Sequence, residues 1–475
     1  MGIRRQARRR RGAVAALAAA FLVRIWALPL WGTFDNEVQK AWSARAATAG
    51  LADIYGPSDR ELVARARARG GGVIGQLTTM PYPKTQFEWG TARYFVDYPP
   101  GSVLVLWAAG EGYAWFAPGL PNRRGFNAAI NVAPLLASLA IAALLFASAP
   151  GPLGGVRALA FWLNPAVILA APVLGYQDTI FGALALAAVL AMMGGRLPAA
   201  TLLVVLSGLV KPQGALLLPT LAILLAREAR PALWLKAALG GIAAAAAVLA
   251  PWWTQGYLLS ALDGCRRPLG QGTLAPLGFN VWWIAGWIMR RDAGEPWPLA
   301  EIVTIDAFHA WSGIDPRSVS RVLLAAATLA VVAFLASRLR AGGGARTWAI
   351  PVSVILQVHA YALVGTSVHE NHTFLAVVLA PLLLGAWPRS RALLAGTSGF
   401  LFANLFLAAG FGRRITSQRF LRALRSAPGL DLTVAVAAAH AVLVALMAAW
   451  AIGSDGRAPA AAPPGGAGDA RIRTG

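Results

Sequence analysis

Several stretches of this chain stay apolar for about the length of a membrane-crossing helix, and this feature constrains the fold most. At a rise of 1.5 Å per residue, roughly 20 apolar residues cross a hydrocarbon core about 30 Å thick. Only 13% of the 475 residues are charged, against about 25% in soluble globular proteins. We therefore expect an all-α, polytopic transmembrane helical bundle, with its clearest spans at 13–31, 128–148, 232–253, 318–340 and 431–453.

The chain is strongly basic, with a net charge of +22 from 42 Lys and Arg against 20 Asp and Glu. In a soluble protein this charge would suggest nucleic acid. Here the basic residues cluster in short loops between apolar segments, as the positive-inside rule describes, so we expect the lipid bilayer and no nucleic acid as a partner. The basic segment 1–12 precedes an apolar stretch without a cleavage pattern. This predicts a cytoplasmic N-terminus on a multi-pass membrane protein; the membrane that we expect is a bacterial plasma membrane.

The pattern divides the chain into four parts. A basic N-terminus, 1–12, is followed by a module at 13–253 that includes a long extracytoplasmic loop, 32–100. A second transmembrane module with external loops covers 254–453, and the Ala/Pro/Gly-rich tail 454–475 is expected to be disordered. We predict 11 to 14 membrane segments, the shorter ones re-entrant or shielded by protein. They are 13–31, 101–118, 128–148, 153–172, 177–194, 198–210, 213–226, 232–253, 276–290, 318–340, 347–366, 373–388, 391–411 and 431–453.

The charge rule orients these segments but leaves one conflict. Strict alternation from a cytoplasmic N-terminus places Arg157 at an external end, where a basic residue is not expected. The charge rule itself puts the following residues in the cytoplasm: Arg123, Arg124, Arg196, Arg227 and Arg230.

The first external loop opens with a helical pattern. Apolar residues from Val38 to Ala49 recur at helical spacing, and Gly50 is a plausible stop. This predicts a helix of about four turns on the membrane surface, with Asp35 at its N-terminus. Asp35 is then either an N-cap or a group that works at an anion-attracting helix end, and the two readings are compatible.

Two further polar groups interrupt apolar stretches. Asp178 follows Gly175-Tyr176-Gln177 and is either an interfacial cap or a buried carboxylate. Lys211 interrupts the apolar stretch 198–226. A lysine in mid-membrane costs about 2.5–3.5 kcal/mol on insertion scales, so it usually faces a cavity or a partner. The alternative is a turn between short helices, from which Lys211 snorkels to the surface.

The last polar cluster is His369-Glu370-Asn371-His372, between apolar segments. Two histidines at i and i+3 could bind a metal, but the spacing differs from the H-E-x-x-H pattern that places both imidazoles on one helical face. A phosphate or substrate site is the favoured interpretation. We therefore expect no metal or other cofactor, and leave a divalent metal open.

In order along the chain, these motifs resemble those of the GT-C superfamily of polyprenyl-phosphate-sugar-dependent glycosyltransferases. The nearest group is the dolichyl-phosphate-glucose glucosyltransferases of N-glycan precursor assembly and their bacterial relatives. That group carries D-x-E-x-Q-x-x-W in its first external loop, then D-Y-P-P, a buried K-x-Q and a His-Glu pair. The matching residues are Asp35, Glu37, Gln39 and Trp42; Asp97 and Tyr98; Lys211 and Gln213; and His369 and Glu370.

The resemblance implies an inverting, metal-independent transfer of a hexose at the extracytoplasmic membrane face. The donor would be a polyprenyl-phosphate sugar, and the acceptor a hydroxyl of a glycolipid or lipid-linked glycan. Asp35, with Glu37, would be catalytic, and His369 would lie near the donor phosphate. The remaining expected substrate-binding residues are Glu370, Lys211, Gln213, Gln177, Asp178, Asp97, Tyr98, Trp42 and Gln39. Asn371 and the basic stretch 60–69 depart from the family pattern and leave the sugar and the acceptor open.

Three other functions stay open at this point. A transporter or flippase of lipid-linked sugars would use similar basic residues but would need no base at Asp35. A protein O-mannosyltransferase-like enzyme shares the GT-C plan, but that family pairs adjacent Asp and Glu, which Asn36 separates here. A scaffolding role is disfavoured by Lys211 and Asp178, because charges inside the membrane are costly unless they are used.

Overall fold

The chain forms an all-α structure, which we describe from a computed structural model covering residues 2–56, 96, 98–228, 230–266, 272–295, 301–342, 345–412, 415–427 and 430–454. Within these ranges the only paired strands are two-residue ones, β1 (Ser426–Ala427) and β2 (Leu430–Asp431). The predicted all-α class is confirmed. The helices of the first half are α1 (Gly2–Ala27), α2 (Phe34–Ala49), α5 (Pro100–Phe116), α6 (Arg124–Ala147), α7 (Pro152–Trp162), α8 (Pro165–Ile168), α9 (Asp178–Met193), α10 (Leu197–Val210), α11 (Leu218–Glu228) and α12 (Pro231–Trp253).

The second half continues in the same way. Its helices are α13 (Leu258–Arg266), α14 (Val281–Asp292), α15 (Ile305–Ser312), α16 (Pro316–Ala341), α17 (Ala345–Val364), α18 (Phe374–Leu379), α19 (Ser390–Ala409), α20 (Gln418–Arg425) and α21 (Leu432–Gly453). Short 3₁₀ turns lie at Leu51–Tyr55 (η1), Pro212–Leu217 (η3) and Ala380–Leu383 (η5), and a π-helical turn (η2) lies at Leu169–Val173.

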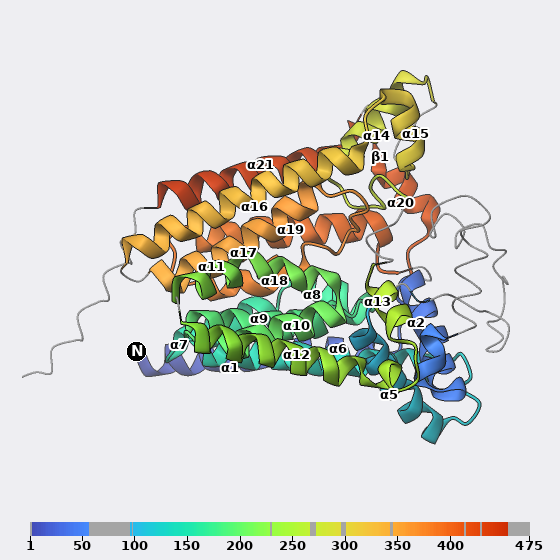
Figure 1. Ribbon diagram of the computed structural model, residues 1–475, viewed down its shortest axis with the longest axis horizontal. Helices are drawn as coiled ribbons and strands as arrows, with labels where there is room; N and C mark the ends of the chain where they lie inside the picture. The colour runs from blue at the N-terminus through green and yellow to red at the C-terminus, as the bar shows by residue number, and fades with distance from the viewer. Residues whose placement is uncertain are drawn as a thin grey trace, which may run out of the picture.

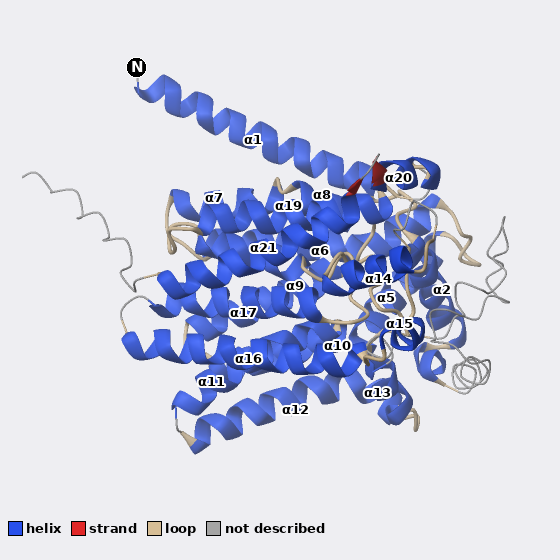
Figure 2. Cartoon of the chain, turned by 90° about the horizontal axis from the view of Figure 1, so that it is seen from above, coloured by secondary structure: helices blue, strands red, loops and turns tan. Residues whose placement is uncertain are grey.

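The long helices run side by side along one axis, so the bundle has two distinct ends (Figure 1). The start of α1 lies at one, which we call the N-terminal end. At the other, the loop end, lie α2, α13, α14, α15 and α20. Seen from above, α1 lies along the edge of the bundle and its N-terminus points away from it (Figure 2).

Among the residues that the structure describes, six helices are long and apolar enough to cross a membrane: α6, α12, α16, α17, α19 and α21. A seventh span is possible if α7 and the segment Pro165–Val173, which are bent by 48° relative to each other, count as one. A polytopic membrane protein is thus supported with six or seven spans, fewer than the 11 to 14 segments predicted. The difference arises largely because the predicted segments 177–194, 198–210 and 373–388 form shorter apolar helices: α9, α10 and Phe374–Leu383.

Two predicted spans lie at the loop end instead: 101–118, which forms α5, and 276–290, most of which forms α14. Both ends of α5 lie at the loop end, since the Ser102 hydroxyl donates to the Val210 carbonyl beside Lys211, and Asn122, just beyond α5, hydrogen-bonds to Lys40 of α2. Arg123 and Arg124 follow Asn122 and therefore lie at the loop end, so they and the N-terminus cannot both be cytoplasmic, as was predicted.

Removing α5 from the spans also removes the conflict at Arg157. The chain now returns to the N-terminal end through α6, and Arg157 lies there on α7. Its guanidinium donates to the carbonyls of Ser148 and Leu384. Arg157 thus lies at the same end of the bundle as the N-terminus, as the positive-inside rule requires if the N-terminus is cytoplasmic as predicted.

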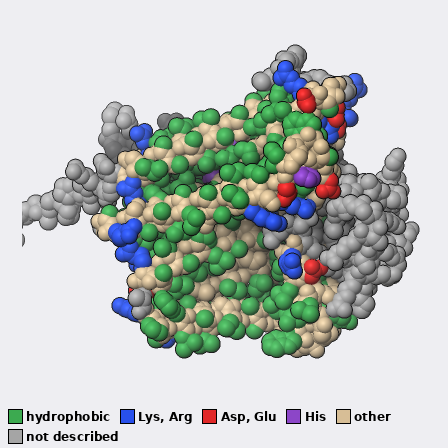
Figure 3. Space-filling view, turned by 45° about the horizontal axis from the view of Figure 1, so that its top comes forward, with side chains coloured by type: hydrophobic (Ala, Val, Ile, Leu, Met, Phe, Trp, Pro, Cys, Tyr) green, Lys and Arg blue, Asp and Glu red, His purple; other side chains and the backbone are tan. Residues whose placement is uncertain are grey.

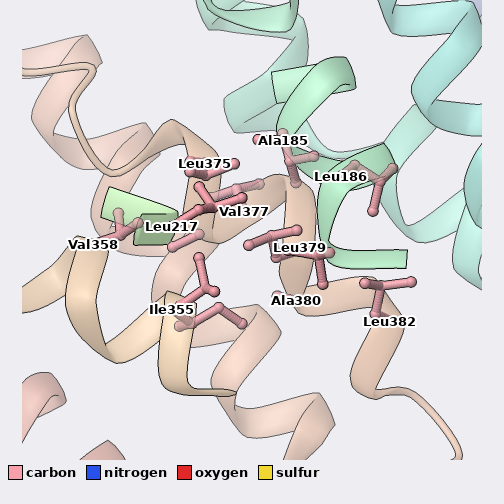
Figure 4. Close-up of a cluster of buried hydrophobic side chains, with 14 of the residues drawn as sticks. Ala185, Leu186, Leu217, Ile355, Val358, Leu375, Val377, Leu379, Ala380 and Leu382 are labelled. Atoms are coloured by element: carbon pink, nitrogen blue, oxygen red, sulfur yellow. The ribbon is translucent and has the colours of Figure 1, made fainter. Parts of the chain in front are cut away.

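Apolar side chains from distant segments form the main core. Ala185 and Leu186 of α9, Leu217 of η3 and Ile355 of α17 meet residues of α18 and η5 there (Figure 4). Because α18 and η5 are fully buried, they need no lipid contact, and their short length is compatible with a position inside the bundle. Outside, apolar side chains form a belt with Lys and Arg at its N-terminal end (Figure 3), as expected for helices facing lipid.

The packing of α5 on α2 generates a stability prediction. A Cβ atom at Gly110 of α5 would lie 2.6 Å from the Ser43 carbonyl oxygen of α2, whereas one at Gly112 would meet nothing within 4 Å. Gly110→Ala should lower the free energy of unfolding by about 1–3 kcal/mol through overpacking. Gly112→Ala should leave it unchanged or raise it by up to about 1 kcal/mol. Thermal midpoints of the two variants in detergent test this, and equal midpoints would contradict the close α2–α5 contact.

Candidate functional site

Helix α2 forms as predicted, from Phe34 to Ala49, and ends at Gly50 with a φ of 92°. Its N-cap is Thr33, so Asp35 is the second helical residue and the interpretation of Asp35 as the N-cap was wrong. The Thr33 amide donates to the Leu174 carbonyl at 3.1 Å. This bond attaches the start of α2 to the turn that leads into α9.

Two glycines make this attachment close. Gly32 and Gly175 have φ values of 60° and 77°, and a Cβ atom at either would lie 2.2 Å from Nδ2 of Asn36. The Asn36 side chain is fully buried between them. Only glycine tolerates both the left-handed backbone and this contact, so the joint fixes where Asp35 lies relative to residues 176–178.

The second part of the site is a buried ion pair. The Lys211 ammonium, directly after α10, donates to the Asp178 carboxylate at the start of α9. Asn371 donates to the other oxygen of Asp178 at 2.7 Å. Asp178 is 1% exposed and Lys211 is 8% exposed. Of the alternatives left open, the structure therefore shows a buried carboxylate for Asp178 and a protein partner for Lys211, rather than a lysine that snorkels.

The third part is the turn that carries His369 and Glu370. Ser367 enters it with a φ of 58°, a conformation that costs about 1–3 kcal/mol for a non-glycine residue and needs support from its surroundings. The Ser367 amide donates to Leu274 at 3.1 Å, and Leu277 pairs with His369 in an isolated antiparallel bridge. The segment before α14 therefore holds this turn in place.

Glu370 is anchored from two further directions. The Tyr176 hydroxyl donates to its carboxylate, and Asn404 of α19 donates to its carbonyl at 2.9 Å. Burial is the main influence on both groups of this hydrogen bond. It raises the pKa of Glu370, and it raises the pKa of Tyr176 well above its ordinary value.

These three parts converge on Asp35. Burial raises the pKa of Asp35 to about 6, and the negative charge of Glu370 adds to this, while His369 and Lys211 oppose it. Glu370 and Asp178 also act on Asp35 as like charges. Residues that are more than 300 positions apart in the sequence thus interact electrostatically at the loop end of the bundle.

His369 lies half-buried beside Glu370, with Nδ1 3.9 Å from the carboxylate. Burial lowers the pKa of His369 to about 4, and the charge of Asp35 partly opposes this. In the absence of a ligand, the imidazole is therefore neutral at neutral pH. Within the described residues of this cluster, Lys211 is then the fixed positive charge. It pairs with Asp178 and interacts electrostatically with Asp35 and Glu370.

Other residues expected in the site lie around this cluster in different roles. The Glu37 carboxylate is bound by Lys40 at 2.8 Å and by Asn122 at 3.1 Å, which ties it to the α5–α6 connection and leaves Asp35 as the carboxylate of α2 that faces the cluster. Gln39 accepts from Gln177 at 3.2 Å beneath α2.

The aromatic pair and the remaining polar residues complete the surroundings. The rings of Trp42 and Tyr98 lie 5.4 Å apart. Gln213 is buried in η3, two residues after Lys211, and its Oε1 has no hydrogen-bond partner. Asp97 lies outside the described residues. All of the expected site residues that the structure describes, except Tyr98, therefore lie on α2 or within two residues of Asp178, Lys211 or His369. Their roles stay predictions.

Sequence reasoning assigned no role to the residues that hold the site together. These are Tyr176, Asn371, Asn404 and Leu277. Tyr176 and Asn371 are adjacent to recognised motif residues, so a search for hydrogen-bonding neighbours would have proposed them. Asn404 lies within an apolar helix, where a buried amide is a signal for a partner. Leu277 gives no signal in the sequence.

No group of three or more His, Cys, Asp or Glu side chains with a metal-binding arrangement occurs in the part of the chain that the structure describes. The metal-independence of the site nevertheless stays a prediction. Comparison with models of known protein families and with functionally curated proteins finds no match for this chain. Its function must therefore be argued from the arrangement of Asp35, Lys211 and the His369–Glu370 turn.

The raised pKa of Asp35 has a consequence for stability. Its pKa is about 6 in the folded protein and 3.8 in its ordinary state, so between these values the folded state binds more protons than the unfolded state. Stability attributable to Asp35 is therefore lost as pH rises from about 4 to about 6. Asp35→Asn, which removes the charge, should be more stable than the wild type above pH 6, by about 1–2 kcal/mol for a partly exposed group.

Thermal midpoints measured from pH 4.5 to 8 test this prediction. The matched control is Asp53→Asn, which removes a carboxylate that pairs with Arg45 at 3.0 Å near the end of α2. It should bring no gain in stability. An Asp35→Asn midpoint below that of the wild type at pH 7 would contradict the electrostatic environment described for Asp35.

Proposed function

We propose that this protein is a membrane glycosyltransferase. It would move a hexose from a polyprenyl-phosphate donor to a hydroxyl of a lipid-linked or glycan acceptor. The main support for this proposal is that Asp35 interacts electrostatically with Lys211 and His369 at the loop end of a membrane-spanning bundle. The family resemblance of the motifs agrees with it.

Asp35 suits the role of general base. Its carboxylate makes no hydrogen bond or ion pair with any described residue, unlike Asp178 and Glu370, and it is half-buried. A base works best when its pKa lies near the working pH, and a pKa of about 6 leaves Asp35 deprotonated but basic at neutral pH. It could accept a proton from an acceptor hydroxyl.

The opposite part of the cluster suits a phosphate. Lys211 supplies a fixed positive charge, and His369 supplies an imidazole that can gain a proton when a negative group approaches. Such groups stabilise the charge that develops on a departing phosphate. The cluster holds three carboxylates and one ammonium group. A second positive charge, on protonated His369, is therefore needed to balance the negative charge of a bound phosphate.

The proposed reaction is a single displacement. The acceptor oxygen attacks the anomeric carbon, and a new carbon–oxygen bond forms as the bond to the phosphate oxygen breaks. The electron pair leaves with the phosphate, beside Lys211 and His369, and the hydroxyl proton moves to Asp35. One displacement inverts the configuration of the sugar. A donor with a polyprenyl chain would remain in the bilayer while its sugar reaches the loop end.

The direct test uses the purified chain reconstituted in liposomes with a polyprenyl-phosphate hexose labelled in the sugar. Glycosyltransferase activity predicts labelled product with a lipid extract as acceptor. Mass spectrometry of membrane glycolipids, with and without the gene, would identify that product. Movement of the donor across the bilayer with its sugar intact would instead support a flippase and overturn the proposal.

Replacing Asp35 should separate chemistry from folding. Asp35→Asn keeps the shape of the side chain but removes its basicity, so we expect transfer to fall by about 10²–10⁴-fold with normal membrane insertion. In the wild type, kcat/KM should rise with pH around 6, where Asp35 loses its proton. The Asp53→Asn control should keep this rise. Near-wild-type turnover of Asp35→Asn would remove Asp35 from the role of base.

Replacing His369 should act on the donor. Since an approaching phosphate raises the pKa of His369 from about 4, donor binding should take up a proton, and KM for the donor should increase as pH rises. His369→Ala should reduce kcat/KM for the donor and remove this pH dependence, while sparing acceptor affinity. His369→Gln, which keeps a hydrogen-bond donor without a titrating group, should bind the donor with no such dependence. A KM that follows pH equally in all three proteins would exclude this role.

A further inference from the structure

A recess of about 350 Å³ lies at the N-terminal end of the bundle, opposite the Asp35 cluster. It lies between the end of α11, the start of α12, the end of α16 and the start of α17. Its volume is in the range of small-molecule binding pockets, about 300–1,000 Å³. The recess is lined by two leucines, one glutamate and three arginines: Leu224, Leu339, Glu228, Arg227, Arg230 and Arg346.

The three arginines come from three helix termini. Arg227 lies in the last turn of α11, Arg230 is the N-cap of α12, and Arg346 lies in the first turn of α17. Arg346 donates from Nε and Nη2 to the Met192 carbonyl, at 3.3 and 3.0 Å. These bonds fix the plane of its guanidinium at the edge of the recess.

None of the three guanidinium groups forms an ion pair with a carboxylate of the described residues. Glu228 also lines the recess, so three positive charges and one negative charge face it. Like charges that converge without a partner repel one another, and an anion would relieve this repulsion. A planar guanidinium binds the oxygens of a phosphate particularly well, through paired hydrogen bonds.

A tryptophan beside the recess indicates the level of a lipid headgroup. Trp234, in the first turns of α12, is 47% exposed and donates from its indole nitrogen to the Leu225 carbonyl at 2.8 Å. Tryptophan with one polar and one apolar side is typical of the membrane–water interface. Leu235, Leu239 and Ile242, which follow Trp234 on α12, are exposed as well.

We propose that this recess binds the headgroup of an anionic phospholipid that carries two phosphodiesters. The two phosphates would match the excess of two positive charges, and the acyl chains would lie along the exposed apolar face of α12. Basic recesses between spanning helices on the cytoplasmic side are suited to such lipids. This site is independent of the glycosyltransferase proposal, because it shares no residue with the Asp35 cluster.

Native mass spectrometry of the full chain in neutral detergent tests the proposal. The probes are diphosphatidylglycerol, phosphatidylglycerol, phosphatidylcholine and inorganic phosphate. The wild type should retain diphosphatidylglycerol most tightly. Arg227→Gln combined with Arg230→Gln should weaken this binding by about tenfold or more, and Glu228→Gln should strengthen it.

The matched control is Arg389→Gln combined with Arg391→Gln. It removes the same charge where α19 begins, outside the recess, and should retain the lipid. Both arginines of each double variant are exposed, so we expect all of these proteins to fold, which their thermal midpoints check. Equal losses in the two double variants, or equal retention of phosphatidylcholine by the wild type, would overturn the proposal. Complete displacement of the lipid by equimolar inorganic phosphate would overturn it in favour of a free anion.

Discussion

The buried ion pair between Lys211 and Asp178 is the interaction on which the rest of the site depends. A charge inside a membrane-spanning bundle is costly unless a partner and further hydrogen bonds compensate it. Here Asn371 supplies the second bond to Asp178, so the pair joins the end of α10, the start of α9 and the turn before α18. Removing the side chain of Lys211, Asp178 or Asn371 would leave a buried polar group without its partner, and the contacts between these segments would have to rearrange.

Around this pair, the protein uses backbone geometry to bring a surface helix close to the bundle. Gly32 and Gly175 let Asn36 lie between them, which holds the N-terminus of α2 against the turn that carries Tyr176. On the other side, Ser367 and Leu277 adopt left-handed conformations and hold the His369–Glu370 turn. The strain of these conformations is offset by hydrogen bonds and packing. Asp35 thus faces groups from three other parts of the chain without forming a bond to any of them, which is the arrangement a general base needs.

The two ends of the bundle differ in their chemistry. The loop end combines carboxylates, a lysine and histidines in a buried cluster, whereas arginines gather at the N-terminal end without carboxylate partners among the described residues. The apolar belt separates them (Figure 3). This asymmetry is consistent with the two proposals made above, in which the loop end carries the transfer chemistry and the N-terminal end binds an anionic lipid.

The sequence alone determined the class of the protein and the helix that carries Asp35. A lack of charge over about 20 residues admits few structures in lipid, because backbone groups must bond within the segment, and the spacing from Val38 to Ala49 is that of a helix whatever surrounds it. The sequence alone could not determine which apolar segments cross the membrane. Helix α5 has the composition of a span but lies on α2, because Gly110 and Ser43 allow the two backbones to approach. Nor could it decide whether Lys211 faces lipid or Asp178, since 33 residues separate them. Only tertiary packing decided that Asp35, Lys211 and His369 share one site, because their proximity comes from contacts between helices that no local pattern encodes.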